Sequence, residues 1–302
     1  MHRKKTALTI RVSIAAALTV MPASFSAAAA EPAFSGASAL EYTRRMVSFG
    51  ARPAGSPEMR RLQAWMLAEL KAFKCTVAED NFTASTPLGP KAMKNLIARF
   101  PGTSGKAIAI TGHYDTKSMP GLYFVGANDG GASGGLLMAL AAALSGRTRK
   151  DDVYLVWFDG EEAFAQWSDT DGIYGSRHLA EKWAAESVLP RIKALINVDM
   201  IGDRDLDILM ETNSSATLRK LVWDTAAKLG VKKHFLDLGG AVEDDHMPFL
   251  RRGVNALNLI DFNYGPGNSY WHTDKDTVDK LSAESLGVVG AVLLETIKEL
   301  EK

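Results

Sequence analysis

The sequence predicts an α/β protein with an open, twisted, mostly parallel central sheet that is flanked by helices on both faces. Three observations predict this fold class. Short apolar runs bounded by turn residues alternate with stretches of helical periodicity, several of the runs are apolar on both faces, and polar residues follow them directly. In open sheets of this class, functional sites lie in the crevice outside the carboxyl ends of the strands.

Each element is predicted from its own pattern. The run Ser56–Phe73 shows the helical signal clearly, because Ser56 suits an N-cap, Pro57 suits the first helical position, and apolar residues follow at helical spacing. The predicted strands are Asn95–Phe100, Ala107–Thr111, Val153–Phe158, Ala194–Val198 and Ala256–Ile260. The predicted helices are 38–49, Ser56–Phe73, Gly131–Leu144, Ser176–Ala185, Ser215–Leu229 and Ser282–Glu301.

The first thirty residues have the pattern of a targeting segment. Basic residues from Arg3 to Arg11 precede the apolar stretch Val12–Val20, and small residues follow at Ala28 and Ala30. The stretch is much shorter than the roughly 20 apolar residues of a membrane-spanning helix. We therefore expect a signal peptide with cleavage near Ala30, export to the periplasm or the medium, and no stable membrane insertion.

Composition narrows the choice of partners and of metal ligands. Lys+Arg and Asp+Glu are both 35, so there is no basic excess of the kind that binds nucleic acid. Cys75 is the only cysteine, so no disulfide forms within the chain and any metal must be held by His, Asp and Glu. With no linker or repeat dividing residues 31–302, we expect a single domain there.

Candidate site residues lie just after the predicted strands or in loops beside them. Two strands are followed by His113 with Asp115 and by Asp159–Glu162, and Asp199 directly follows a third. A metal site is one interpretation, since zinc accepts nitrogen and oxygen ligands, and surface acids with two satisfied histidines are the other. The set that can converge in one crevice is His113, Asp129, Glu162, Asp199 and His272.

Two pairs of adjacent acidic residues, Glu161–Glu162 and Asp244–Asp245, are further candidates for the site. Glu161 and Glu162 are adjacent after a buried strand, so one can bind a metal while the other stays free to move protons. Asp244 precedes Met247 and suits either the capping of a short helix or a hydrogen-bonding role in the site. Among the aromatic residues nearby, Trp271 is the expected pocket wall, because a loop residue beside a candidate ligand has little core available to it.

Several segments resemble the metal-dependent exopeptidase clan and, within it, the glutaminyl cyclases. The resemblance covers most of residues 31–302. The segments that match the clan in order are His113–Lys117, Gly126–Gly130, Asp159–Glu162 and Trp271–Thr273. Two longer stretches, 158–180 and 244–254, are similar to glutaminyl cyclases in particular.

The resemblance implies a zinc aminopeptidase-like fold and a set of residue roles. It implies one catalytic zinc bound by Asp129, Glu162 and His272, with Glu161 as the acid/base. It further implies that Asp199 and Asp244 belong to the hydrogen-bond network that receives displaced ammonia, and that Trp167 and Trp271 line the pocket. The implied reaction converts the N-terminal glutamine of a peptide to pyroglutamate.

A second activity stays open. The segment Asn128–Gly130, followed by Ala132–Gly134, resembles the two-zinc aminopeptidases more closely than the animal cyclases, and the family's disulfide beside the first metal-site segment is missing. His113 and Asp199 are then the expected ligands of a second zinc, and the reaction is hydrolysis of the first peptide bond. A module that only binds a peptide or zinc is the third alternative, although it requires no acid/base at Glu161.

Overall fold

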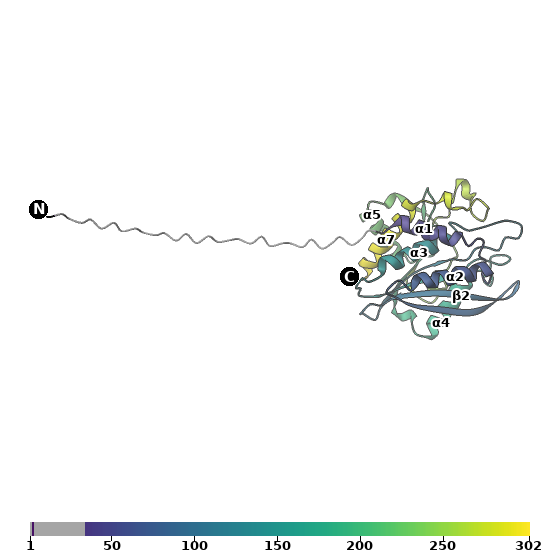
Figure 1. Ribbon diagram of the computed structural model, residues 1–302, viewed down its shortest axis with the longest axis horizontal. Coiled ribbons are helices and arrows are strands. Elements are labelled where there is room, and N and C mark those ends of the chain that lie inside the picture. Colours follow the sequence, from purple (N-terminus) through teal and green to yellow (C-terminus); the bar gives the residue numbers. More distant parts are fainter. Residues whose placement is uncertain (1, 3–33) are drawn as a thin grey trace. The chain divides into compact units, whose positions relative to one another are not determined.

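The computed structural model describes His2 and residues 34–302, and Ala33–Lys302 form one compact unit (Figure 1). The predicted signal peptide and its cleavage point lie outside the described residues. Within them, no helix has both the length and the apolar character needed to cross a membrane.

The centre of the compact unit is a six-stranded mixed sheet with the order β1-β2-β4-β3-β5-β8. The four strands β4, β3, β5 and β8 are parallel, whereas β2 pairs antiparallel with β4 and with β1. A separate two-stranded parallel sheet contains β6 and β7. The strand bounds are β1 Thr76–Thr86, β2 Gly89–Phe100, β3 Ala107–His113, β4 Asp152–Phe158, β5 Ile192–Asp199, β6 Ile208–Glu211, β7 Phe235–Gly240 and β8 Ala256–Ile260.

All five predicted strands are present, and three others were missed. Strand β1 is an edge strand with mostly exposed, polar side chains, so it offers no apolar run to the sequence analysis. Strand β2 begins at Gly89 rather than Asn95, because its first half pairs only with β1. Strand β6 has only four residues, and most side chains of β7 are exposed or partly exposed, so neither offers a clear apolar run.

The predicted helices are confirmed, with small shifts at their ends. Ser56 caps α2 by accepting a hydrogen bond from the Met59 amide, and Ser215 and Ser282 cap α5 and α7 in the same way. The helix bounds are α1 Gly36–Val47, α2 Pro57–Leu70, α3 Gly131–Leu144, α4 Tyr174–Ala185, α5 Ala216–Lys228, α6 Met247–Leu250 and α7 Ala283–Leu300. Short 3-10 turns occur at Leu189–Arg191, Lys232–His234, Pro266–Asn268 and Val278–Lys280.

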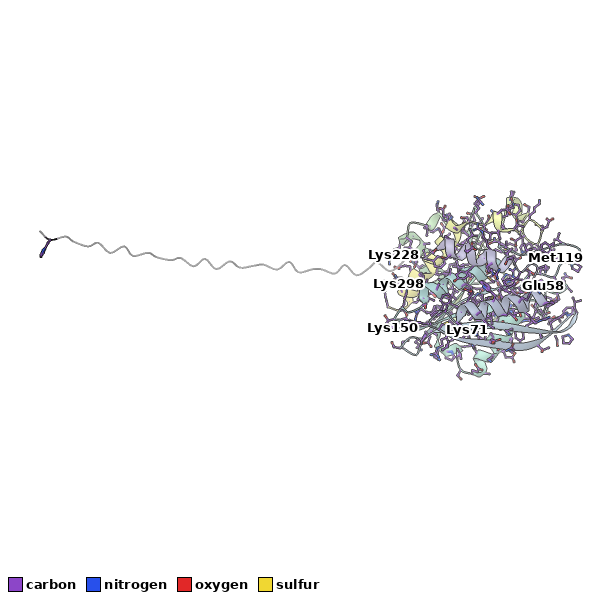
Figure 2. All side chains as sticks on the ribbon, viewed as in Figure 1. Glu58, Lys71, Met119, Lys150, Lys228 and Lys298 are labelled. Atoms are coloured by element: carbon purple, nitrogen blue, oxygen red, sulfur yellow. The ribbon has the colours of Figure 1, made fainter. Side chains whose placement is uncertain are left out.

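Helices cover both faces of the sheet, as predicted. Alternate residues of β3 face opposite sides: Ile108 and Ile110 belong to a core cluster with residues of α1, α2, α3, α5 and α7, while Ala107 and Ala109 belong to a second cluster with residues of α4 and α6. In Figure 1, α4 lies on the opposite side of β2 from α2 and α3. Lys228, labelled in Figure 2, lies in α5 and donates hydrogen bonds to Glu295 and Glu299 of α7, which joins these two helices.

The parallel strands bring the candidate residues to one edge. His113 is the last residue of β3 and is paired with Phe158, the last residue of β4, so Glu161 follows only three positions further on. Asp199 ends β5 and is paired with Ile260 at the end of β8. The carboxyl ends of four neighbouring strands therefore meet, which is where open α/β sheets bind their ligands.

Candidate active site

Asp129, Glu162 and His272 come together from three separate loops. Each offers one ligand atom, and these atoms all lie within 4.8 Å of one another. The Nε2 atom of His272 is 3.3 Å from Asp129 Oδ2 and 3.1 Å from Glu162 Oε1. Ligand atoms of a tetrahedral zinc site are about 3.4 Å apart when each is about 2.1 Å from the metal.

The donor set and one unpartnered atom fit a metal ion. Asp129 Oδ2 is buried and accepts no hydrogen bond among the described residues, although buried polar atoms are nearly always satisfied. Two carboxylates and one imidazole form a ligand set that zinc accepts. These three residues can therefore hold a metal and leave a fourth position for substrate.

A second group shares Asp129. His113 Nε2 lies 3.2 Å from Asp129 Oδ1 and 3.1 Å from Asp199 Oδ1, and the ligand atoms of these three residues also lie within 4.8 Å of one another. The two oxygens of Asp129 thus face two different imidazoles. All five residues of the predicted set lie in one crevice, in two groups of three that have Asp129 in common.

The backbone around these residues adopts uncommon conformations. His272 has a φ of 54° and Met200, directly after Asp199, has a φ of 47°, both in the left-handed region that non-glycine residues rarely occupy. Gly130, after Asp129, has a φ of 79°, and a Cβ there would lie 2.3 Å from the Asp115 carbonyl oxygen. Only glycine permits this close approach.

Two buried carboxylates hold the ligand loops in place. Asp115 accepts from the Glu161 and Glu162 amides at 3.1 and 3.4 Å. Asp276 accepts from the Asn128 and Asp129 amides at 2.8 and 3.2 Å. No local pattern indicates a role for Asp276, since only the fold brings its loop against the Gly-rich turn, whereas Asp115 is indicated by its place after a strand and within the segment His113–Lys117.

Glu161 lies in an environment that favours a bound proton. Burial raises its pKa well above the ordinary value, and the nearby charges of Glu162 and Asp244 raise it further against the opposing effect of His113. A carboxyl group with a raised pKa is suited to hold and release a proton, as an acid/base requires.

The pKa of His272 is also raised, but for a different reason. Burial lowers it, but the Asp129 and Glu162 carboxylates beside the ring outweigh burial and raise it to about 9. The imidazole is thus attracted strongly to the two carboxylates. A metal cation at the same point would exploit the same negative potential.

Asp244 takes part in a hydrogen-bond network and does not cap the short helix. Its Oδ1 accepts from Asn197 Nδ2 at 3.1 Å and its Oδ2 accepts from Asn258 Nδ2 at 2.7 Å. Helix α6 has His246 at its N-cap position and no side-chain cap. Burial, followed by the charge of Asp199, raises the pKa of Asp244 to about 6.

These side chains line a cavity of about 510 Å³ at the mouth of the crevice. Trp167 is 40% exposed at its wall, and Trp271 stacks on His272 with ring centroids 4.1 Å apart. Tyr264, by contrast, is buried and donates to Asp276, so it belongs to the core. The lining includes Lys117, Asp129, Glu161, Glu162, Trp167, Asp199, Leu209, Val242, Asp244, Phe262, Trp271 and His272.

Glu211 ties the end of β6 to the loop that carries Asp244. Its Oε1 accepts from the Asn213 and Val242 amides, and its Oε2 accepts from the amide and hydroxyl of Ser214. Burial raises its pKa, but His246, 3.3 Å away, and these donors outweigh burial and lower it to about 2. A buried carboxylate with four donors is a strong local anchor.

The structure has an open α/β sheet with carboxylates and imidazoles gathered at the carboxyl ends of its parallel strands. This arrangement places the protein in the class of α/β enzymes that are related to the zinc exopeptidases. The model of Peptidase family M28 matches residues 95–297. The chain belongs to this family, in its glutaminyl-peptide cyclotransferase branch.

Similar curated proteins and similar solved structures support the assignment to this family. The chain is 31% identical to the glutaminyl-peptide cyclotransferase of Drosophila melanogaster, over 79% of this chain and 75% of that protein. It is 30% identical to the Bos taurus protein of the same name, over 82% and 74%. A crystal structure of a glutaminyl cyclase from an Acidobacteriales bacterium matches with a TM-score of 0.87 and 37% identity, over 94% of this chain and 99% of that one.

The ionised Glu211 is expected to stabilise the fold. Replacing it in Glu211→Gln removes acceptors from buried donors and should lower the free energy of unfolding at pH 7 by about 1–3 kcal/mol. Because its folded-state pKa is depressed, the stabilisation is present above the unfolded-state value of about 4.3 and is lost as the pH falls through about 2. Urea unfolding of both proteins at pH 7 and pH 3 checks this, and a difference that is larger at pH 3 contradicts it.

Proposed function

We propose that this chain is a glutaminyl-peptide cyclotransferase that converts the N-terminal glutamine of peptides to pyroglutamate and releases ammonia. One observation carries the geometric part of the proposal. A carboxyl group with a raised pKa, Glu161, lies in the same pocket as Asp129, Glu162 and His272. The relatives over most of the chain support the same activity.

The proposed metal ligands are Asp129, Glu162 and His272. A zinc ion bound there supplies Lewis-acid polarisation of the glutamine side-chain amide. One ion is proposed for cyclisation, and a second, held by His113 and Asp199, belongs to the hydrolytic alternative.

Glu161 is the proposed acid/base. The α-amine of the substrate attacks the side-chain amide carbon, a carbon–nitrogen bond forms, and Glu161 takes the proton that the amine loses. Glu161 then delivers this proton to the amide nitrogen, whose bond to carbon breaks, so that neutral ammonia leaves. One carboxyl group that can both accept and donate a proton suffices for both steps.

The remaining pocket residues position the substrate and receive the product. Asp199 and Asp244 are proposed to accept hydrogen bonds from the leaving ammonia. Trp167 and Trp271 are proposed to enclose the glutamine side chain and hold the amine near the amide carbon. Such orientation is effective because both reacting groups belong to the same molecule.

Hydrolysis by an aminopeptidase is the second candidate. The group formed by His113, Asp129 and Asp199 favours it, because a two-metal site is a common way to activate water. In that reaction Glu161 removes a proton from water, and the first peptide bond breaks. The two candidates differ in product, since only hydrolysis releases a free amino acid.

A paired-substrate assay distinguishes the candidates. We expect a Gln-initiated peptide to yield ammonia and a product lighter by one ammonia, and a Leu-initiated peptide of otherwise equal sequence to remain intact. Ammonia is measured enzymatically, and the peptides and free amino acids by mass spectrometry. Release of leucine from the Leu-initiated peptide, with no ammonia formed from the Gln-initiated peptide, would overturn the cyclase assignment.

Substitutions separate metal binding from proton transfer. Glu161→Gln should retain zinc and lose at least about 100-fold in kcat, since general acid–base catalysis contributes about 10²–10⁴-fold. His272→Ala should lose both zinc and activity. Zinc content after dialysis and ammonia release are measured on each protein. A Glu161→Gln enzyme with wild-type turnover contradicts the role of Glu161.

The targeting pattern of residues 1–30 supports export, with residues 31–302 as one catalytic domain. Expression of the full-length chain in a bacterium should yield a periplasmic or secreted protein whose N-terminus lies close to residue 31. N-terminal sequencing of the fractionated protein checks this, and an intact N-terminus on cytoplasmic protein contradicts it.

A further inference from the structure

Two asparagines lie in positions where apolar residues would be expected. Asn197 in β5 and Asn258 in β8 are 1% and 0% exposed and are direct partners in the register of the two strands. Their neighbours along both strands, such as Ile196, Val198 and Leu257, belong to the core. Buried polar side chains of this kind call for a specific reason.

The hydrogen bonds of the pair fix how both amides are oriented. A carboxylate only accepts, so the amide nitrogens of Asn197 and Asn258 must be the atoms that face Asp244. Asn197 Nδ2 also donates to Asn258 Oδ1 at 3.1 Å, and Thr111 in β3 donates to Asn197 Oδ1 at 2.8 Å. Three neighbouring strands thus hold the two amides in one arrangement.

The same bonds limit what Asp244 can accept. Each carboxylate oxygen has about two lone-pair positions. Oδ1 accepts from Asn197 and from the Asp245 amide, so both of its positions are used. Oδ2 accepts from Asn258 alone, which leaves one position on an atom of a residue that lines the pocket with Glu161.

We propose that Asn197 and Asn258 are positioning residues, an amide clamp that fixes the Asp244 carboxylate and leaves a single acceptor position on Oδ2. This position accepts an N–H group of the bound N-terminus or of the leaving ammonia, a role that rests on the proposed function. The asparagines themselves do not touch the substrate.

Rigidity is the physical benefit of the clamp. An unrestrained carboxylate rotates and offers four acceptor positions, so it binds the reacting nitrogen in several orientations. A carboxylate held at three of them offers one direction, and orientation of this kind affects the reaction barrier more than it affects binding. The clamp should therefore contribute to kcat and little to KM.

The test replaces Asn258 and uses a matched asparagine as control. Asn258→Leu, which removes the donor at similar volume, should lower kcat about 10- to 100-fold, in line with the loss of one hydrogen bond to a charged group. KM should change less than about 3-fold on the same energy scale. The control is Asn255→Leu, because among the residues that the structure describes the Asn255 side chain donates to the Lys193 carbonyl oxygen alone, at 3.3 Å, and Asn255 lies just before β8. It should retain wild-type kcat.

A double-mutant cycle separates positioning from packing. If Asn258 acts through Asp244, adding Asn258→Leu to Asp244→Asn should lower kcat by less than about 2-fold, because the carboxylate to be held is gone. An equal loss from Asn258→Leu in both backgrounds would overturn the clamp. Asn258→Ala removes the same donor without placing a second carboxyl group beside Asp244 and serves as a second variant if the leucine enzyme does not fold; it should lose kcat similarly.

The assays distinguish a failure of the clamp proposal from a failure of the proposed function. All variants are assayed with the Gln- and Leu-initiated peptides. If the wild type hydrolyses the Leu peptide instead of cyclising the Gln peptide, the cyclase assignment fails, and the coupling between Asn258 and Asp244 is measured on hydrolysis. Absence of coupling in whichever reaction the wild type catalyses overturns the clamp.

Discussion

Asp129 faces His113 with one carboxylate oxygen and His272 with the other, and the rest of the crevice is arranged around this contact. The carboxylate is buried, so its charge must be matched locally. Its backbone is held by Asp276, and the glycine after it allows the Asp115 carbonyl oxygen to approach closely. The position of one side chain thus depends on two distant segments of the chain, residues 113–115 and 272–276.

The crevice concentrates negative charge in a buried space, and this explains its chemistry. Glu161, Glu162, Asp129, Asp199 and Asp244 all line one cavity, which raises the pKa of Glu161 and favours a cation among the imidazoles. The backbone amides of Glu161 and Glu162 donate to the nearby Asp115 carboxylate, and the side-chain amides of Asn197 and Asn258 donate to Asp244, so hydrogen bonds match part of this charge. Stability and catalysis therefore depend on the same hydrogen bonds.

Much of the fold could be predicted because its core strands and helices are strongly patterned. The bounds Gly131–Leu144 and Ala256–Ile260 were predicted as they stand, since an apolar run between turn residues leaves little choice. Strand β1 was missed because an exposed edge strand carries no such run.

By itself, the sequence determined the α/β class, which strands are followed directly by polar residues, and the residue types available to bind a metal. Local periodicity and composition are properties of neighbouring residues, so they can be assessed without a fold. Only the tertiary structure decided which oxygen of Asp129 faces which histidine, and that Asp244 bonds to Asn197 and Asn258 rather than capping a helix. Those contacts join residues far apart in the chain, and their geometry follows from strand register and loop packing, which no local pattern encodes.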